Sequence, residues 1–195
     1  MRKGEATKQE IFRQAAPVFN RQGFAGSSLS DIMAATGLQK GGIYNHFESK
    51  EQLALETFDY AAELMRLHWE QAVDGRETAQ EQLEAFIEAF SRMASAPEIA
   101  GGCPLLNTAI ESDDTNLPLR DRVREAFSYW RGWLASIVRQ GRQRGEMQAD
   151  AESAATLILS TLEGALMLSQ LYEDDTPLQE AAVRLTRFVR RDVCL

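Results

Sequence analysis

The sequence has few of the residues that build metal sites, disulfide frameworks and hydrolytic active sites. Two cysteines and two histidines occur among 195 residues. Cys103 and Cys194 stand far apart and form no CxxC pair, so neither a disulfide framework nor a structural zinc site is indicated. GxSxG, P-loop, GxGxxG and HExxH motifs are also missing. We therefore expect no metal, no cofactor and no enzymatic activity.

Long apolar runs are missing too. The N-terminus, MRKGEATKQE, moves from basic to polar residues without the apolar segment of a signal peptide. By inspection, no window approaches the apolar length of a membrane-spanning helix. These features predict a cytoplasmic protein with no membrane partner.

Prolines and glycines, which interrupt helices, are scarce at five and thirteen. We find no sustained alternation of β-branched residues, so strands have little room and the pattern predicts an all-α fold. Pro17 lies inside the first expected helix and predicts a kink or break near residues 13–16. The expected helices cover residues 5–21, 28–36, 39–46, 50–72, 77–95, 103–112, 117–144, 151–172 and 177–192.

Charge is distributed unevenly along the chain. The net charge is -8, yet residues 1–55 hold seven Lys or Arg against five Asp or Glu. That N-terminal quarter is therefore net +2 and the remainder net -10. An anion-binding surface is expected near the start of the chain.

The stretch GLQKGGIYNHFESKEQL, residues 37–53, follows a short helix that ends in the turn ATGLQ. Two short helices joined by a tight turn containing glycine, with a preceding helix beside them, are typical of a helix-turn-helix unit. In such a unit the second helix enters the DNA major groove. The stretch therefore predicts binding to double-stranded DNA.

Residue chemistry assigns roles within this stretch. Gln39 and Lys40 lead the second helix and are expected to reach bases, as is Asn45, whose amide can pair with adenine. Glycines allow the backbone to approach the duplex closely. Taken singly, each residue also has an ordinary structural explanation. The predicted phosphate contacts are Tyr44, His46, Lys50 and Ser28, and the close-approach positions are Gly41 and Gly42.

Residues 11–53, including AAPVFNRQGFAGSSLSDIMAATGLQKGGIYNHFESKEQL, resemble the DNA-binding domain of the tetracycline-repressor (TetR) family. The resemblance implies a homodimer of roughly nine helices, in which a C-terminal helical bundle binds a small-molecule effector that usually releases DNA. It implies a helix-turn-helix domain at residues 1–50 and a ligand-binding and dimerisation domain at 51–195. Pro17 departs from the family pattern, as does Gly42, where many members have Ser, Thr or Ala.

The last two helices are the expected dimer interface. Their apolar positions could equally face the core of their own subunit. The stripe comprises Ala155, Ile158, Leu159, Leu162, Leu166, Ser169, Val183, Leu185, Phe188 and Val189.

Ligand pockets combine apolar and aromatic side chains with a few polar groups. Asn107 and Glu163 are the polar candidates, because each interrupts an apolar helical face, although simple exposure would also explain them. The predicted ligand-binding set is Trp69, Phe86, Phe90, Met93, Leu106, Asn107, Phe127, Trp130, Glu163 and Met167.

Two alternatives to a ligand-responsive repressor stay open. Pro104 suits the first turn of a helix, which places Cys103 at the positive end of the helix dipole and allows a repressor that senses oxidants or electrophiles. An acidic helical adaptor without DNA binding is the other alternative. It leaves the basic N-terminal quarter and the glycine pair unexplained.

Overall fold

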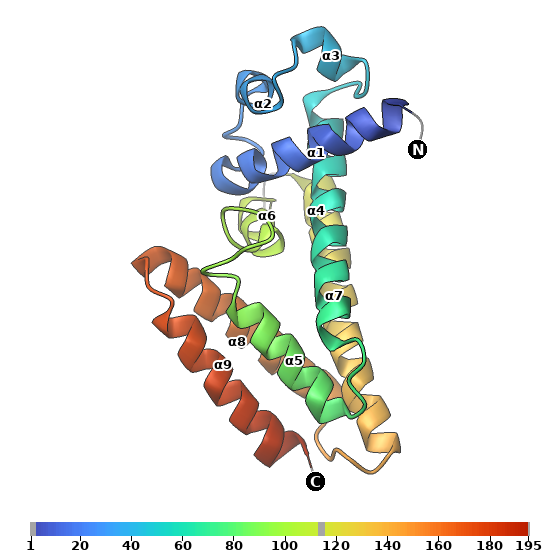
Figure 1. Ribbon diagram of the computed structural model, residues 1–195, viewed down its shortest axis with the longest axis vertical. Coiled ribbons are helices and arrows are strands. Elements are labelled where there is room, and N and C mark those ends of the chain that lie inside the picture. Colours follow the sequence, from blue (N-terminus) through green and yellow to red (C-terminus); the bar gives the residue numbers. More distant parts are fainter. Residues whose placement is uncertain (1–2, 113–115, 195) are drawn as a thin grey trace. The chain divides into compact units, whose positions relative to one another are not determined.

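The computed structural model describes residues 3–112 and 116–194, which form nine α-helices and a closing π-helical turn (Figure 1). No strand occurs among these residues, and Met147 and Cys194 form an isolated bridge. The elements are α1 (Lys3–Gln22), α2 (Leu29–Thr36), α3 (Lys40–Tyr44), α4 (Lys50–Val73), α5 (Ala79–Ser91), α6 (Pro104–Ser112), α7 (Leu117–Gln143), α8 (Ala151–Tyr172), α9 (Thr176–Phe188) and η1 (Val189–Val193).

The predicted all-α fold is confirmed, with one correction in the first helix. α1 continues through Pro17 as one helix, so a break near residues 13–16 is wrong, and the alternative of a kink there stays a prediction. Burial explains the difference: Ile11, Phe12 and Phe19 lie in a shared core on both sides of the proline. Packing along the helix offsets the missing backbone hydrogen bond.

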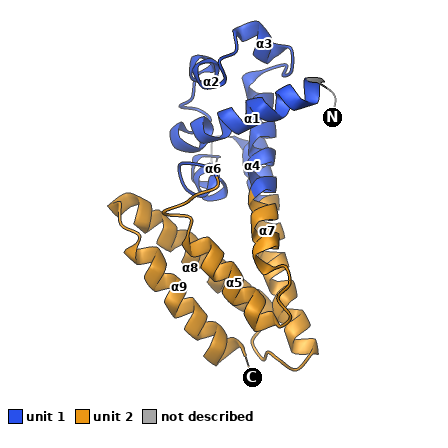
Figure 2. Cartoon of the chain, in the orientation of Figure 1, with its two compact units in different colours: residues 1–64, 99–124 blue, residues 65–98, 125–195 orange. Residues whose placement is uncertain are grey.

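The chain divides into two compact units (Figure 2). Unit 1 comprises residues 1–64 and 99–124, and unit 2 comprises residues 65–98 and 125–195. Two of the three boundaries fall inside α4 and α7, so both helices contribute to both units, and the third lies between α5 and α6. The expected functional boundary at residue 50 stays a prediction, because the compact units group the chain differently and assign α6 to unit 1.

Unit 1 is built around a core shared by α1, α2, α3 and the first turns of α4. Ile32 of α2 and Ile43 of α3 are almost completely buried against α1. Phe47 and Leu53, which flank the start of α4, complete this core. Burying one large apolar side chain is worth about 1.5–3 kcal/mol, so these few residues are enough to hold the two short helices in place.

Unit 2 contains a cluster of aromatic rings. The ring of Trp69 stacks on Phe90 with a centroid distance of 5.4 Å and meets Phe86 and Trp130 edge-on at 5.5 and 6.0 Å. Phe127 in turn lies edge-on to Trp130 at 6.1 Å. Edge-on and stacked arrangements both suit aromatic quadrupoles, so the cluster is a rigid part of this core.

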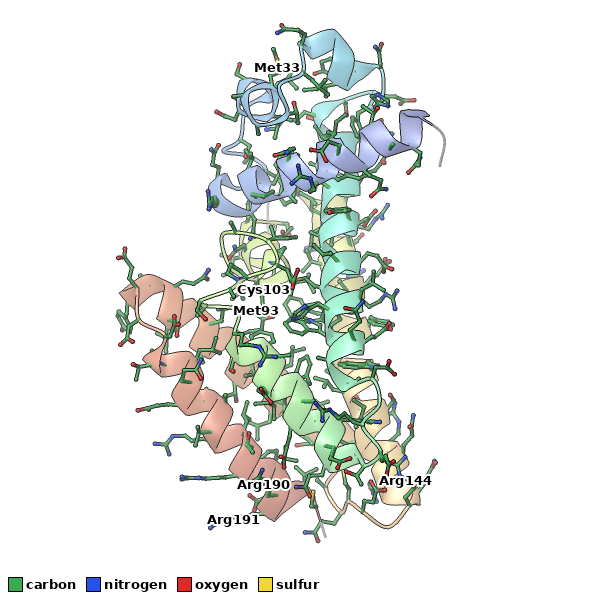
Figure 3. All side chains as sticks on the ribbon, viewed as in Figure 1. Met33, Met93, Cys103, Arg144, Arg190 and Arg191 are labelled. Carbon is green, nitrogen blue, oxygen red and sulfur yellow. The ribbon has the colours of Figure 1, made fainter. Side chains whose placement is uncertain are left out.

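The C-terminal turn is fastened to the rest of unit 2. Arg190, at the end of the chain in Figure 3, donates two hydrogen bonds of 2.8 Å to the carboxylate of Glu84 on α5. These hydrogen bonds lower the pKa of Glu84. The backbone N–H of Gln148 also donates to the carbonyl of Val193 at 2.9 Å. The last helical residues therefore have a fixed place against α5 and the segment before α8.

α8 corrects one expectation about apolar runs. By length and composition alone, residues 151–172 could cross a membrane, whereas the sequence inspection found no such window. Half of the tested stretch is buried inside the fold. A helix that supplies one face to a protein core passes the same test, so the composition of α8 is explained by its packing in unit 2.

Candidate DNA interface

α2 and α3 are two short helices whose ends are set by local sequence. Ser28 begins α2 with a capping box, in which the N–H of Asp31 donates to the Ser28 hydroxyl and the N–H of Ser28 donates to the Asp31 carboxylate. Gly37 ends α2 in the left-handed conformation, with φ of 68°. Only glycine adopts this conformation without strain, so the chain turns sharply into α3.

The Ser28 hydroxyl donates its proton to Asp31 at 2.6 Å. This bond and the one from the Ser28 backbone N–H lower the pKa of Asp31, so its carboxylate stays ionised, and the cap stays formed, to a lower pH than for an ordinary aspartate. A hydroxyl has one proton to donate, so Ser28 cannot donate to a phosphate while the cap is intact. The structure therefore gives Ser28 the role of fixing the start of α2.

α3 has one buried and one exposed face. Ile43 is buried in the unit 1 core, whereas Gln39, which precedes the helix, and Lys40, Gly41 and Tyr44 are exposed. The Lys40 ammonium lies 5.7 Å from the centre of the Tyr44 ring, so the two side chains share one face.

The two glycines of α3 have different surroundings. A Cβ atom at Gly41 would meet nothing within 4 Å among the described residues, and one at Gly42 would lie 3.5 Å from Leu38. Neither glycine is required by the packing of the protein itself. The free protein therefore has room for a methyl group at both positions.

The remaining predicted DNA contacts flank α3. Asn45 follows the helix and is exposed, and His46 is half-buried with its ring 6.4 Å from Phe47. Lys50 begins α4, and its ammonium donates to the carbonyl of Phe24 at 2.6 Å. An ammonium has three protons, so this bond leaves Lys50 able to contact a phosphate as well.

Lys8 of α1 is a cation packed on the core beneath α3 that sequence reasoning did not single out. Its ammonium lies 5.2 Å from the Phe47 ring and 5.9 Å from the Phe12 ring, and it pairs with Glu56. A single lysine among polar residues of α1 gives no pattern signal. Its contacts depend on residues about 40 positions along the chain.

Comparison with known proteins decides what this helix-turn-helix belongs to. Residues 11–57 match the family model described as bacterial regulatory proteins of the tetR family, and residues 79–185 match the tetracyclin repressor-like C-terminal domain. The chain belongs to the TetR family of transcriptional regulators. The resemblance found in residues 11–53 is confirmed and extends over both halves of the chain.

Relatives and solved structures agree with this membership of the TetR family. The chain is 30% identical over 174 residues to the HTH-type transcriptional regulator LmrA of Bacillus subtilis, covering 88% of this chain and 90% of LmrA. A TetR transcriptional regulator from Chloroflexus aurantiacus has a crystal structure that matches with a TM-score of 0.96 and 49% identity, covering 100% of both chains. A TetR-family regulator from Cytophaga hutchinsonii matches with a TM-score of 0.89 and 34% identity, over 97% and 96% of the two chains. The protein is thus a DNA-binding transcriptional regulator.

Unit 2 of this TetR-family regulator brings together five of the predicted ligand residues. Trp69, Phe86, Phe90, Phe127 and Trp130 form the aromatic cluster. The indole Nε1–H of Trp69 is buried and has no hydrogen-bond partner among residues 3–112 and 116–194. An unpaired buried donor costs about 1–3 kcal/mol, which marks this position as one where a ligand acceptor would be favourable.

The other predicted ligand residues have varied surroundings. Met93 and Glu163 are buried in unit 2, with exposed fractions of 4% and 5%. Met167 is 44% exposed on α8, so it does not line an interior pocket of unit 2. Leu106 and Asn107 belong to unit 1, where the Asn107 amide bonds to α1. The expected ligand roles of Met167 and Asn107 stay predictions, and their observed surroundings do not support them.

The predicted dimer stripe on α8 is also corrected. Ala155, Ile158, Leu162 and Leu166 are all buried inside their own subunit. The exposed apolar side chains of α8 lie on its other face. A repeat of 3.6 residues shows that a helix has an apolar face but not which partner covers it.

Both cysteines are buried. Cys103 is fully buried immediately before α6, and burial also raises the pKa of the Cys194 thiol. Reactive cysteines are partly exposed and have a lowered thiol pKa. This burial disfavours a redox or electrophile sensor based on Cys103.

Proposed function

We propose that the protein is a ligand-responsive transcriptional repressor that binds a palindromic DNA operator as a homodimer and is released by a small-molecule effector. The observation that carries the DNA-binding part is the exposed face of α3. It presents Gln39, Lys40 and Tyr44 beside a glycine whose missing side chain serves no contact within the protein. A surface of this kind fits the floor of a major groove.

Within this proposal the side chains divide into two groups. Gln39, Lys40 and Asn45 read base edges, because they are flexible polar groups at the two ends of α3. Tyr44, His46 and Lys50 hold phosphates, and Ser28 supports them by capping α2. Gly41 and Gly42 allow the backbone of α3 to approach the duplex.

The proposed dimer forms through α8 and α9, on the face of these two helices that is exposed to solvent in the single protomer. Leu157 and Leu168 are 45% and 36% exposed and line an apolar groove between the two helices. Gly164 lies in the same groove, and a Cβ there would meet nothing within 4 Å among the described residues. Two such faces packed together form a four-helix interface, which lets two recognition helices read half-sites about 34 Å apart.

The proposed effector site is the aromatic cluster of unit 2. Stacked and edge-on rings offer a flat apolar surface, and Trp69 adds one buried donor without a partner among the described residues. An apolar molecule that carries a hydrogen-bond acceptor would satisfy both. Glu163 is a buried carboxylate of the same unit and the predicted second polar contact.

Selection of tight binders from random duplex DNA tests the DNA proposal. We expect the selected sequences to share an inverted repeat, and we expect binding measured by fluorescence anisotropy to weaken steeply with salt. Tyr44→Ala and Lys50→Ala should each weaken binding about tenfold on every sequence, because each removes a phosphate contact. Gln39→Ala or Lys40→Ala should instead change the preferred bases.

Arg131→Ala is the matched control for charge, since Arg131 is exposed on α7. It removes one positive charge from unit 2, outside the helix-turn-helix residues, and should leave operator affinity nearly unchanged. A Tyr44→Ala, Lys50→Ala double variant that binds the selected duplex as tightly as the wild type would refute the assigned interface.

A further inference from the structure

The turn between α1 and α2, residues 23–27, is held by a side chain from far along the chain. One Glu111 carboxylate oxygen accepts the backbone N–H of Phe24 at 2.8 Å, and the other accepts that of Ala25 at 2.7 Å. Lys50 donates to the carbonyl of Phe24 at 2.6 Å. All four residues lie in unit 1. Two successive N–H groups thus form a concave anion-binding site that Glu111 fills.

Gly23 makes room for this carboxylate. Its backbone has φ of 76°, and a Cβ atom there would come within 2.9 Å of the Glu111 carboxylate carbon and both its oxygens. Any side chain at this position would push Glu111 away from the two N–H groups. The glycine and the glutamate are therefore a matched pair.

Asn107, one helical turn before Glu111, makes a second contact between α6 and α1. Its amide donates to the side chain of Asn20 at 2.9 Å and to the carbonyl of Gly101 at 2.8 Å. Asn20 in turn donates to the carbonyl of Gly102 at 3.0 Å. α6 is thus bonded to the end of α1 and to the turn that follows it.

Packing holds this turn on one side only, where the Phe24 ring stacks on Phe19. A cavity of about 210 Å³ lies beside it, lined by Phe24, Ala54, Ser112 and Leu119 among others. Apolar contacts across such a space are incomplete. The bonds to Glu111 and Lys50 fix the backbone of residues 24 and 25, alongside the stacking of the Phe24 ring on Phe19 at a centroid distance of 4.7 Å.

The turn leads directly into the groups that the proposed function assigns to DNA. Three residues beyond Ala25 is Ser28, which caps α2, and Lys50 is a proposed phosphate contact. We propose that Glu111 is a positioning residue for operator binding: it fixes the α1–α2 turn, and with it the start of α2 and the side chain of Lys50. This inference rests on the proposed DNA-binding function.

Electrostatics and positioning predict opposite effects for Glu111→Gln. Removing a negative charge from a protein that binds a polyanion should strengthen binding slightly. Removing half of the acceptor that holds the turn should weaken binding, by about tenfold if one charge-assisted hydrogen bond is lost. The sign of the change therefore distinguishes the two effects.

The experiment compares the full-length wild type, Glu111→Gln and Glu125→Gln on the selected operator duplex by fluorescence anisotropy. Glu125 is an exposed glutamate of α7, so its variant makes the same change in charge without touching the turn. We expect Glu111→Gln to bind about tenfold more weakly. We expect Glu125→Gln to bind as tightly as the wild type or slightly more tightly.

Hydrogen exchange read by mass spectrometry over residues 18–30 separates positioning from general instability. Exchange should accelerate at Phe24 and Ala25 in Glu111→Gln, with unchanged protection in the core helices and a melting temperature lower by only about 2–4 °C, the effect of one lost hydrogen bond. Asn107→Ala is a second variant that loosens α6 and should weaken operator binding by a smaller factor.

Two results would overturn the inference. One is Glu111→Gln binding that equals or exceeds that of Glu125→Gln. The other is weaker binding accompanied by loss of protection throughout unit 1, which would show a role in stability alone. If the wild type selects no operator, the proposed function itself fails, and that result does not depend on any Glu111 variant.

Discussion

At the scale of single residues, the exposed face of α3 combines polar side chains with a position that has no side chain, Gly41. Gly41 lies in a helix, is exposed and has no neighbour that a methyl group would touch among the described residues. Glycine is a poor helix former, so alanine would suit the free protein better. Keeping glycine there has a cost in stability, which the proposed close approach of α3 to DNA would explain.

Gly41→Ala should therefore change stability and DNA binding in opposite directions. We expect the free energy of unfolding to rise by about 0.4–1 kcal/mol, because alanine reduces the freedom of the unfolded chain. Operator affinity should fall, because the new methyl group holds α3 off the duplex. Thermal unfolding and fluorescence anisotropy on the same preparation measure the two effects.

Gly132→Ala is the control for this pair of effects. Gly132 is a glycine of α7 whose Cβ would also meet nothing within 4 Å among the described residues. Alanine there should stabilise the protein and leave operator affinity unchanged. Equal operator affinities for Gly41→Ala and the wild type would contradict the close approach of α3 to DNA.

The sequence pointed to the exposed residues of α3 more readily than to the residues that hold the helix-turn-helix in place. Lys40 and Tyr44 were identified because a short helix after a glycine turn has few positions to offer. Glu111 was not identified as a supporting residue, because it lies 87 residues from Phe24 and no local sequence pattern links the two. Asn107 was assigned to a ligand pocket for the same reason, since its partner Asn20 is equally distant.

At the scale of the helix, α1 shows how far tertiary packing overrides a local rule. Pro17 removes one backbone donor from the interior of α1, yet the helix runs from Lys3 to Gln22. Sequence periodicity located α1 to α9, because the apolar repeat of a helix can be recognised within a short stretch of sequence. It misjudged this interruption because the compensating contacts come from other helices.

Pro17→Ala should stabilise the protein by about 1–3 kcal/mol, since it restores a hydrogen bond and removes the ring from the helix interior. Thermal and urea unfolding measure this change. Pro118→Ala is the control, because Pro118 lies in the first turn of α7, where proline is well tolerated. If Pro17→Ala gains no more than Pro118→Ala, α1 already accommodates the proline without strain.

At the scale of the whole molecule, the proposed dimer depends on the open face of α8 and α9. Leu168 lines that groove and is 36% exposed in the protomer. Burying an apolar groove of this kind is the main favourable contribution to a helical interface. A charge placed there would lose its hydration on burial, a cost that an ion pair in the groove repays only in part.

Leu168→Glu should convert the protein from a dimer to a monomer of 21.8 kDa. Light scattering after size-exclusion chromatography measures the mass, and anisotropy should show weaker operator binding, because one recognition helix reads only half a palindrome. Leu67→Glu is the control, since Leu67 is 42% exposed on α4. A Leu168→Glu variant that keeps twice the monomer mass would place the interface elsewhere.

The bonds from α6 to the α1–α2 turn have a consequence for exchanging parts between related regulators. Residues 1–64 look like a module that could be transplanted, but the carboxylate that fixes their turn is contributed by residue 111. A hybrid that takes residues 1–64 from one parent and α6 from another would lose the matched pair of Gly23 and Glu111. Recombination that preserves DNA recognition should therefore transfer α6 together with the first 64 residues.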